Sequence, residues 1–172
     1  MTYQITYFSP DGHAERLAKA LMPILPRDTV VGQIQPDQEP AADVQIVGIE
    51  LKFADMDKPA KEVTQYLRKL TDRTVLLYVT LPVFTDESHN SRIHKKAAQA
   101  LPADCDYRGL FLSMAQPPEK LLEGFHHAVQ VKPDNRRVQH WCERCERAVG
   151  HPNGEDEAAF RNFAAHVLNI KE

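Results

Sequence analysis

Residues 7 to 14, Tyr-Phe-Ser-Pro-Asp-Gly-His-Ala, join a short apolar run to the first amphipathic helix of the chain. Where a strand stops and continues as a helix, the first helical turn exposes free backbone N–H groups, and the helix dipole there favours negative charge. The stretch therefore indicates a seat for a phosphate group. The alternative is a plain strand-to-helix connection, in which Ser9 or Asp11 caps the helix and Gly12 supplies backbone freedom.

Strand and helix patterns alternate on both sides of this turn. Residues 3 to 8 are mostly β-branched or aromatic, whereas the apolar residues from Ala14 to Met22 recur with the spacing of one helix face. The alternation continues as far as residue 114, and its nearly continuous apolar runs suit strands that are covered on both faces. Further strands are predicted at 28–34, 43–51, 74–81 and 106–114, with helices at 58–70 and 88–101.

Helical patterns dominate the rest of the chain. Pro117 and Pro118 open one helix, a second follows over 136–149, and the last begins near Glu155. Five strands that alternate with helices predict an α/β fold, in which a parallel sheet carries helices on both faces with right-handed crossovers.

The length and composition of the chain narrow the class of protein. With 172 residues we expect a single domain over 1–172, with a helical extension over about 117–172. The 21 Lys and Arg residues against 24 Asp and Glu residues give a formal charge of −3, which disfavours nucleic acid as a partner. The N-terminus lacks the features of a signal peptide, and no run approaches the ~18 apolar residues of a membrane span. Three cysteines, an odd number, fit a reducing compartment, so a cytoplasmic protein without a membrane partner is predicted.

Ligands of open parallel sheets bind beyond the carboxyl ends of the strands, where the strand order reverses. Three loops therefore form the expected site, because they follow the first, third and fourth predicted strands. These loops are Ser9 to Ala14, Glu50 to Lys58 and Leu81 to His89.

These three loops, the five strands and the length resemble the flavodoxin family, which binds FMN and shuttles electrons. Residues 9–14 resemble that family's phosphate loop, Thr/Ser-x-Thr-Gly-Asn-Thr, with Ser9 and Gly12 matching. Asp11 stands where a Thr hydroxyl normally donates to the phosphate, and His13 replaces the Asn. An ionised Asp11 would repel a phosphate dianion, and a protonated His13 would offset part of that repulsion. The resemblance implies a three-layer sandwich with strand order 2-1-3-4-5.

Two further segments resemble a bacterial subgroup of flavodoxin-like proteins. Thr80 to Asp86 with His89 resembles its fourth-strand segment, and Gly150 to Asp156 resembles its C-terminal Gly-His-Pro-acidic tail. Some members of this subgroup accompany flavin-dependent reductases, including bilirubin-reducing ones, and the resemblance implies a role as an accessory electron carrier. This chain departs from the subgroup at Glu50, where an aromatic residue usually stacks on the flavin, and at residues 113–116, which replace a Cys-Gln-Gly-like segment.

The resemblance implies FMN as the cofactor and a reductase as the protein partner. Three functions follow from it: an FMN-binding electron carrier, an accessory protein that docks to a reductase with weak or lost FMN binding, and an enzyme that uses FMN directly. No spacing indicates a catalytic side chain or a metal ligand set. The implied cofactor-binding residues are Ser9, Pro10, Asp11, Gly12, His13, Ala14, Leu51, Lys52, Phe53, Ala54, Thr80, Leu81, Pro82, Val83, Phe84, Thr85 and His89.

Several of these residues, and the cysteines, also have structural interpretations. Phe84 either stacks on the flavin ring or covers the end of the sheet, and His89 either touches the ligand or caps a helix. The Cys-x-x-Cys pair at 142 and 145 invites a metal or redox reading, but both residues fall on one apolar helical stripe and are expected in the core. Cys105 is expected as a lone thiol in a polar loop. His126 and His127 are adjacent on a helix, point in different directions, and are expected at the surface or between helices.

Overall fold

A computed structural model describes residues 1–56 and 58–170, and its centre is a five-stranded parallel sheet in the order β2-β1-β3-β4-β5. This order confirms the predicted architecture. The fourth and fifth strands have the predicted bounds, and the second is shorter than predicted. The strands are β1 (Tyr3–Phe8), β2 (Val30–Gln33), β3 (Val44–Glu50), β4 (Thr74–Leu81) and β5 (Asp106–Met114).

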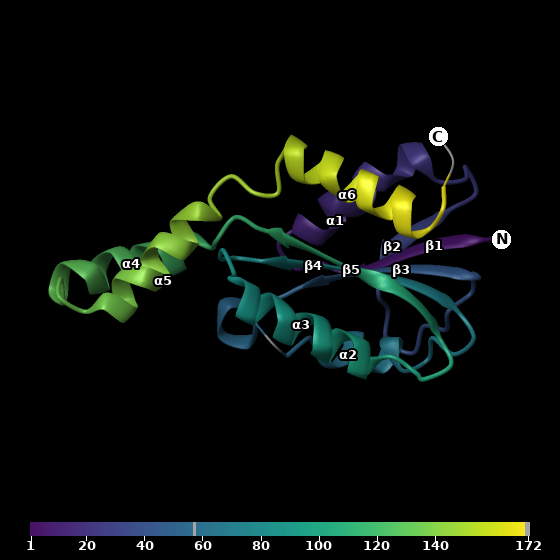
Figure 1. Ribbon diagram of the computed structural model, residues 1–172, viewed down its shortest axis with the longest axis horizontal. Coiled ribbons are helices and arrows are strands. Elements are labelled where there is room, and N and C mark those ends of the chain that lie inside the picture. Colours follow the sequence, from purple (N-terminus) through teal and green to yellow (C-terminus); the bar gives the residue numbers. More distant parts are fainter. Residues whose placement is uncertain (57, 171–172) are drawn as a thin grey trace.

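Helices cover both faces of the sheet, as Figure 1 shows. On one face lie α1 (His13–Leu21), which a short 3-10 turn (Met22–Ile24) continues, and α6 (Gly154–Val167). On the other face lie α2 (Lys61–Leu67) and α3 (Glu87–Ala100). No α-helix in the described part of the chain combines the length and apolar character that crossing a bilayer requires.

The two helical layers create two apolar cores, one on each side of the sheet. All seven residues of β3 are buried, which explains why this strand is apolar almost throughout instead of alternating. Leu67 of α2 belongs to one core, and Leu17 of α1 and Phe160 of α6 belong to the other. Complete burial of such side chains stabilises the fold by about 1.5–3 kcal/mol each.

Tyr78 of β4 ties the sheet to the start of α1. Its ring is fully buried, and its hydroxyl donates a hydrogen bond of 3.0 Å to the carbonyl oxygen of Ala14. The ring lies over Gly48, its register partner on β3, and a Cβ atom at residue 48 would come within 2.2 Å of it. Glycine at 48 is therefore required for the ring to reach the first turn of α1.

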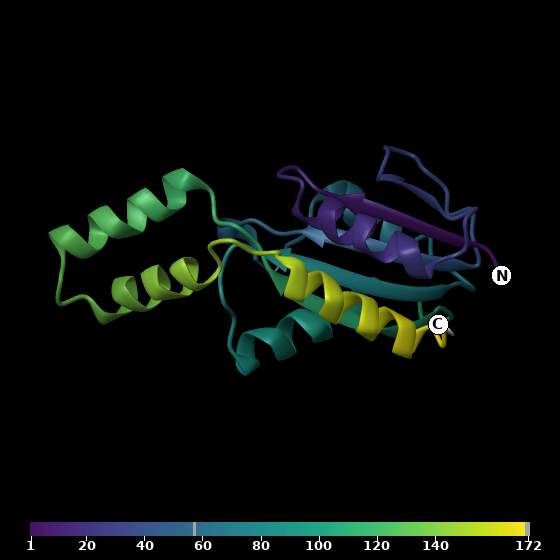
Figure 2. The same cartoon turned by 90° about the horizontal axis from the view of Figure 1, so that it is seen from above.

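The helices α4 (Glu119–Val131) and α5 (Arg136–Arg147) form a hairpin beyond the carboxyl edge of the sheet. Figure 2 shows the hairpin projecting away from the layered body, with α6 returning against the sheet. At its base, Gln116 N–H donates to the carbonyl of His151 (2.5 Å), and the Gln116 Oε1 accepts from Gly150 N–H (2.7 Å). The two ends of the hairpin are therefore joined where they leave the sheet.

Arg144 of α5 anchors the hairpin to the loop after β4. Its carbonyl oxygen accepts from the Phe84 N–H (2.9 Å), and its Nη2 lies 2.6 Å from Oδ2 of Asp86. Asp86 also caps α3, because its Oδ1 accepts from the His89 N–H. The Arg144 guanidinium, followed by the His89 N–H and ring, holds the pKa of the Asp86 carboxyl well below its usual range.

We expect Gly48→Ala to destabilise the protein by about 1–3 kcal/mol, because the new methyl group overpacks the buried Tyr78 ring. Gly32→Ala on the edge strand is the matched control, since nothing lies within 4 Å of a Cβ atom there. Denaturant unfolding measures both variants. Equal midpoints for the two would contradict the tight packing of Tyr78 over Gly48.

We expect Asp86→Asn to loosen the hairpin, which hydrogen exchange of the amides in residues 119–147 would detect as faster exchange. In the wild type, acid should weaken the same contact, because the pKa of Asp86 is lower in the folded state than in the unfolded state. The stability that the ionised carboxylate contributes is fully present above the unfolded-state pKa of about 3.9. It is lost as the pH falls towards the folded-state pKa. Asp106→Asn is the control, since Asp106 pairs with Arg108 within β5. Unchanged hairpin exchange in Asp86→Asn would rule out this anchor.

Candidate functional site

The structure brings the loops after β1, β3 and β4 to the same edge of the sheet, as the parallel strand order requires. Ser9 follows β1 directly, and Glu50 ends β3 beside Thr80 of β4. Both Ser9 and Glu50 are buried, although both are polar. Their side chains therefore have partners at this edge.

The Glu50 carboxylate lies inside the turn that was predicted to hold a phosphate group. The Ser9 hydroxyl donates to Oε2 (2.7 Å), the His13 N–H donates to the same oxygen (3.2 Å), and the Asp11 N–H donates to Oε1 (3.0 Å). We call these three donors the anion seat. Backbone N–H groups at the start of a helix favour a negatively charged partner, and in this structure the group that they contact is the carboxylate of Glu50.

Gly12 gives the anion seat its shape. It precedes α1 as the N-cap residue in the left-handed conformation, with φ of 86°, which suits a residue without a side chain. Neither Ser9 nor Asp11 occupies the N-cap position, so the capping alternative was wrong on that point. The Ser9 oxygen nevertheless accepts from the Glu15 N–H (3.1 Å), because its hydroxyl reaches the first turn of α1 from outside.

A phosphate group does not fit the anion seat in this arrangement. Its three donors are already bonded to the Glu50 carboxylate, so a phosphate could use them only after displacing that carboxylate. Ligand-type atoms of Asp11 and His13 lie within 4.8 Å of the Glu50 carboxylate and of each other. Two carboxylates at one turn would repel a phosphate dianion, since like charges at such distances oppose each other strongly in a partly buried site.

The aromatic residues on the loops after β3 and β4 lie against the hairpin. Phe53 makes edge contacts with Phe125 and Trp141, each with ring centroids 5.3 Å apart. We call these three rings the aromatic cluster. The His89 ring approaches Trp141 edge-on at 5.9 Å. A cleft of about 170 Å³ lies beside the cluster, lined by Phe53, Ala54, Met56, Thr85, His89, Arg92 and Ile93.

Phe84 and His89 both have protein partners. The Arg147 guanidinium lies 3.4 Å from the centroid of the Phe84 ring, so this ring is covered by α5. The Nδ1 atom of His89 lies 2.7 Å from Oδ1 of Asp86, which places His89 at the start of α3 beside the cap residue. His89 is therefore not the cap of α3, and it also lines the cleft.

The remaining predicted residues differ in exposure. Residues that are buried at the strand ends support the loops of the site, but they present little surface to a ligand. Those buried are Ala14, Leu51, Thr80, Leu81, Pro82, Val83 and Thr85. Those exposed are Pro10, Asp11, Lys52 and Ala54.

Sequence reasoning missed the contribution of the hairpin to this edge. Phe125, Trp141, Arg144 and Arg147 contact loops more than 50 residues away, and helical periodicity alone does not identify such partners. The available signal was Asn135, whose side chain caps α5 by accepting from the Val138 N–H. That cap marks where α5 begins, but it does not identify the loops that α5 contacts.

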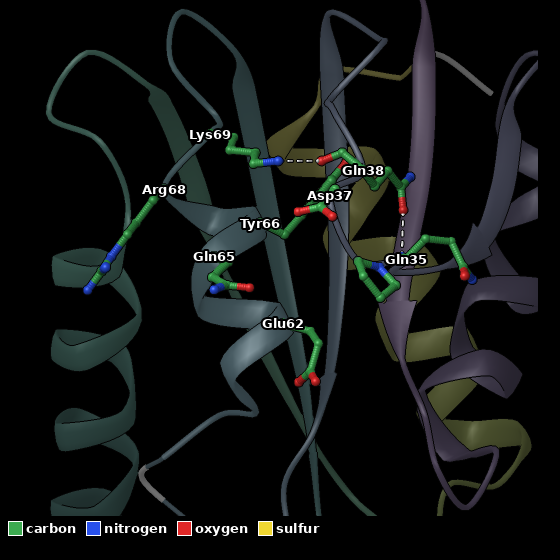
Figure 3. Close-up of a pocket in the computed structure, with 9 residues that line it drawn as sticks. Gln35, Asp37, Gln38, Glu62, Gln65, Tyr66, Arg68 and Lys69 are labelled. Carbon is green, nitrogen blue, oxygen red and sulfur yellow. Dashed lines mark hydrogen bonds between the residues drawn. The ribbon is translucent and has the colours of Figure 1, made fainter.

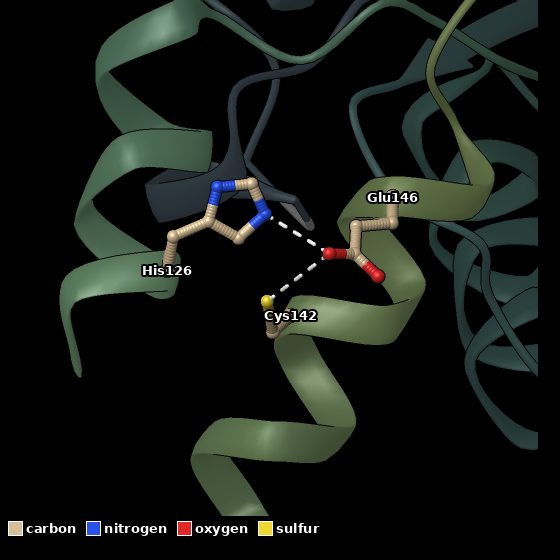
Figure 4. Close-up of side chains that lie close together, drawn as sticks. All are labelled: His126, Cys142 and Glu146. Carbon is tan, nitrogen blue, oxygen red and sulfur yellow. Dashed lines mark hydrogen bonds and ion pairs between the residues drawn. The ribbon is translucent and has the colours of Figure 1, made fainter. Parts of the chain in front are cut away.

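The two cysteines of α5 are buried, as the apolar stripe predicts. Burial raises the pKa of Cys145 to about 11, and burial together with Glu146 raises the pKa of Cys142. Both are therefore thiols at neutral pH. Figure 4 shows Glu146 between His126 and Cys142, with its Oε1 2.9 Å from the His126 Nε2 and 3.8 Å from the Cys142 Sγ. His126 thus links α4 to α5, in agreement with its expected interhelical position.

The Gly-His-Pro tail has a structural role at the start of α6. The Asn153 side chain accepts from the Glu155 and Asp156 N–H groups, and the Asp156 carboxylate accepts from the Asn153 N–H, which completes a capping box. The Nδ1 of His151 lies 2.6 Å from the same carboxylate. These contacts orient α6 as it returns to the sheet.

A second, polar groove of about 270 Å³ lies between α2 and the loop after β2, as Figure 3 shows. Lys69 closes one end of it by donating to the carbonyl of Gln38 (3.1 Å) and pairing with Glu39 (2.6 Å). None of the predicted site residues lines this groove. The candidate site is therefore the carboxyl edge of the sheet.

Comparison with known proteins agrees with this fold. A flavodoxin domain family model matches residues 4–165. The flavodoxin-like domain-containing protein BilS of Clostridium symbiosum (strain WAL-14163) is 22% identical over 178 residues, covering 95% of this chain and 94% of BilS.

Two solved structures share the fold at low sequence identity. A short-chain flavodoxin associated with a non-canonical PDU bacterial microcompartment gives a TM-score of 0.57 at 13% identity, covering 98% of this chain and 97% of its own. Oxidised flavodoxin 2 from Bacillus cereus gives 0.55 at 13% identity, covering 98% and 99%. With the family model spanning nearly all of its length, the chain belongs to the flavodoxin domain family.

Proposed function

We propose that this protein is a flavodoxin-type electron-transfer protein that binds a flavin at the carboxyl edge of its sheet and works with a partner reductase in the cytoplasm. The observation that carries the proposal is the cleft between Phe53 and His89, beside the aromatic cluster, in a chain of the flavodoxin family. The flavin, when bound, supplies the redox chemistry, and the protein supplies binding and shielding.

The aromatic cluster is the part of the site that suits a flavin. Aromatic side chains contribute about 0.5–1.5 kcal/mol per ring contact beyond the burial of area, and Phe53 borders both the cluster and the cleft. The free thiols of the three cysteines are consistent with a reducing compartment. The tail resemblance suggests a flavin-dependent reductase, such as a bilirubin-reducing one, as the partner.

A second candidate is a flavodoxin-fold accessory protein that docks to a reductase without carrying flavin. The observation that favours it is the Glu50 carboxylate in the anion seat, together with the covered ring of Phe84. The two candidates differ in one respect: a carrier raises the rate of the reductase only when flavin is bound, whereas an accessory protein raises it equally when flavin-free. Reductase assays with flavin-loaded and flavin-stripped protein separate them.

Trp141 offers a direct test of flavin binding, because it is the single tryptophan and belongs to the aromatic cluster. We expect added FMN to quench its emission in a saturable manner, since a flavin in the cleft accepts its excitation energy. Phe53→Ala should weaken the binding by roughly threefold to tenfold, as loss of an aromatic contact predicts.

Val131→Ala is the control for Phe53→Ala, because Val131 is an exposed apolar residue at the end of α4. Its affinity for FMN should equal that of the wild type. The carrier proposal would be contradicted if the purified protein is colourless and high-micromolar FMN does not change its Trp141 emission. The second candidate, an accessory protein without flavin, would then be favoured.

A further inference from the structure

We propose that Glu50 sets the flavin specificity of this protein, because its carboxylate takes the place of the ligand phosphate in the anion seat. The ligand class that follows is a flavin recognised by its ring, with little preference for FMN over riboflavin. This inference rests on one part of the proposed function, which is that a flavin binds at the carboxyl edge of the sheet. The state of the anion seat can be tested without any flavin.

Glu50 is placed in the seat by the sheet and not by a flexible loop. It is the last residue of β3, it pairs in register with Thr80, and it is only 7% exposed. The three described donors to its carboxylate all come from the turn after β1. Hydrogen bonds to an ionised acceptor are the strong class, and a buried carboxylate that lost them would be left unsatisfied.

In competition for the donors of the anion seat, the Glu50 carboxylate has an advantage over a ligand phosphate. Glu50 belongs to the same chain as the seat, so its effective concentration there is high and no association entropy is lost when it binds. The phosphate must first displace it and would then share the turn with a buried or newly exposed carboxylate. The phosphate of FMN therefore adds little to the affinity that the ring provides.

Asp11 also disfavours a phosphate in the anion seat, but it does so from the surface of the protein. Its side chain is exposed, and its carboxylate lies within 4.8 Å of ligand-type atoms of Glu50 and His13. It opposes a phosphate by charge, whereas Glu50 opposes it by occupying the donors. Replacing Asp11 leaves the seat filled, so Asp11→Thr should tighten FMN binding less than removal of the Glu50 carboxylate does.

The experiment compares FMN and riboflavin by quenching of Trp141 in the wild type, Glu50→Ala, Glu50→Gln and Asp11→Thr. We expect the wild type to bind the two flavins with affinities within about threefold of each other. In Glu50→Ala the affinity for FMN should rise about tenfold or more while that for riboflavin changes by less than about threefold, as freeing strong donors for a charged ligand predicts.

Glu50→Gln keeps the size of the side chain and removes its charge. It is the variant to test if Glu50→Ala does not fold. It should shift the FMN to riboflavin ratio in the same direction. A wild type that prefers FMN by tenfold or more, or a ratio that is unchanged in folded Glu50→Ala and Glu50→Gln, would overturn the proposal.

A second arm uses inorganic phosphate and the amide NMR signals of Asp11 and His13. These signals should stay in place when phosphate is added to the wild type and should move in Glu50→Ala. If no variant binds a flavin but these signals move as expected, the proposed function fails, and with it the effect of Glu50 on flavin specificity, whereas occupation of the anion seat by Glu50 is supported. If flavins bind and the signals move equally in wild type and variant, the role of Glu50 fails alone.

Discussion

Burial of both faces of the parallel sheet is the constraint on which the rest of this structure depends. Two helical layers cover all of β3 and all of β4 except its first residue, Thr74. Parallel strands such as these need crossover connections, which the helices supply. All strands then end at the same edge. The turn after β1 and the end of β3 meet there because of the sheet order, which is why a carboxylate from one strand can fill a turn from another.

Much of the fold follows from local patterns in the sequence. The bounds of β4 and β5 are those that the apolar runs indicate, and the prolines at 117 and 118 mark the start of α4. The second strand is shorter than its apolar pattern because only Val30–Gln33 finds a partner, at the edge of the sheet. The strand propensity of a segment shows where a strand can form, whereas hydrogen-bonded pairing with a neighbouring strand decides how long the strand is.

The sequence indicated the strand-to-helix turn at Ser9 to Ala14 but not the group that occupies it. In the structure this turn donates hydrogen bonds to the carboxylate of Glu50. That Glu50 fills it depends on a contact between residues about 40 positions apart, which no periodicity encodes. The same holds for the contact between the Trp141 ring and Phe53 at the edge of the sheet, which joins residues of two distant segments.

The closed base of the helical hairpin has a consequence for how this protein can change. The chain leaves β5 and returns to α6 through one point, where Gln116 bonds to Gly150 and His151. The hairpin therefore behaves as an insertion, and a short loop could join the same two ends without moving the sheet or α6. A change in the length of the hairpin would therefore leave the two packed layers of the flavodoxin fold in place.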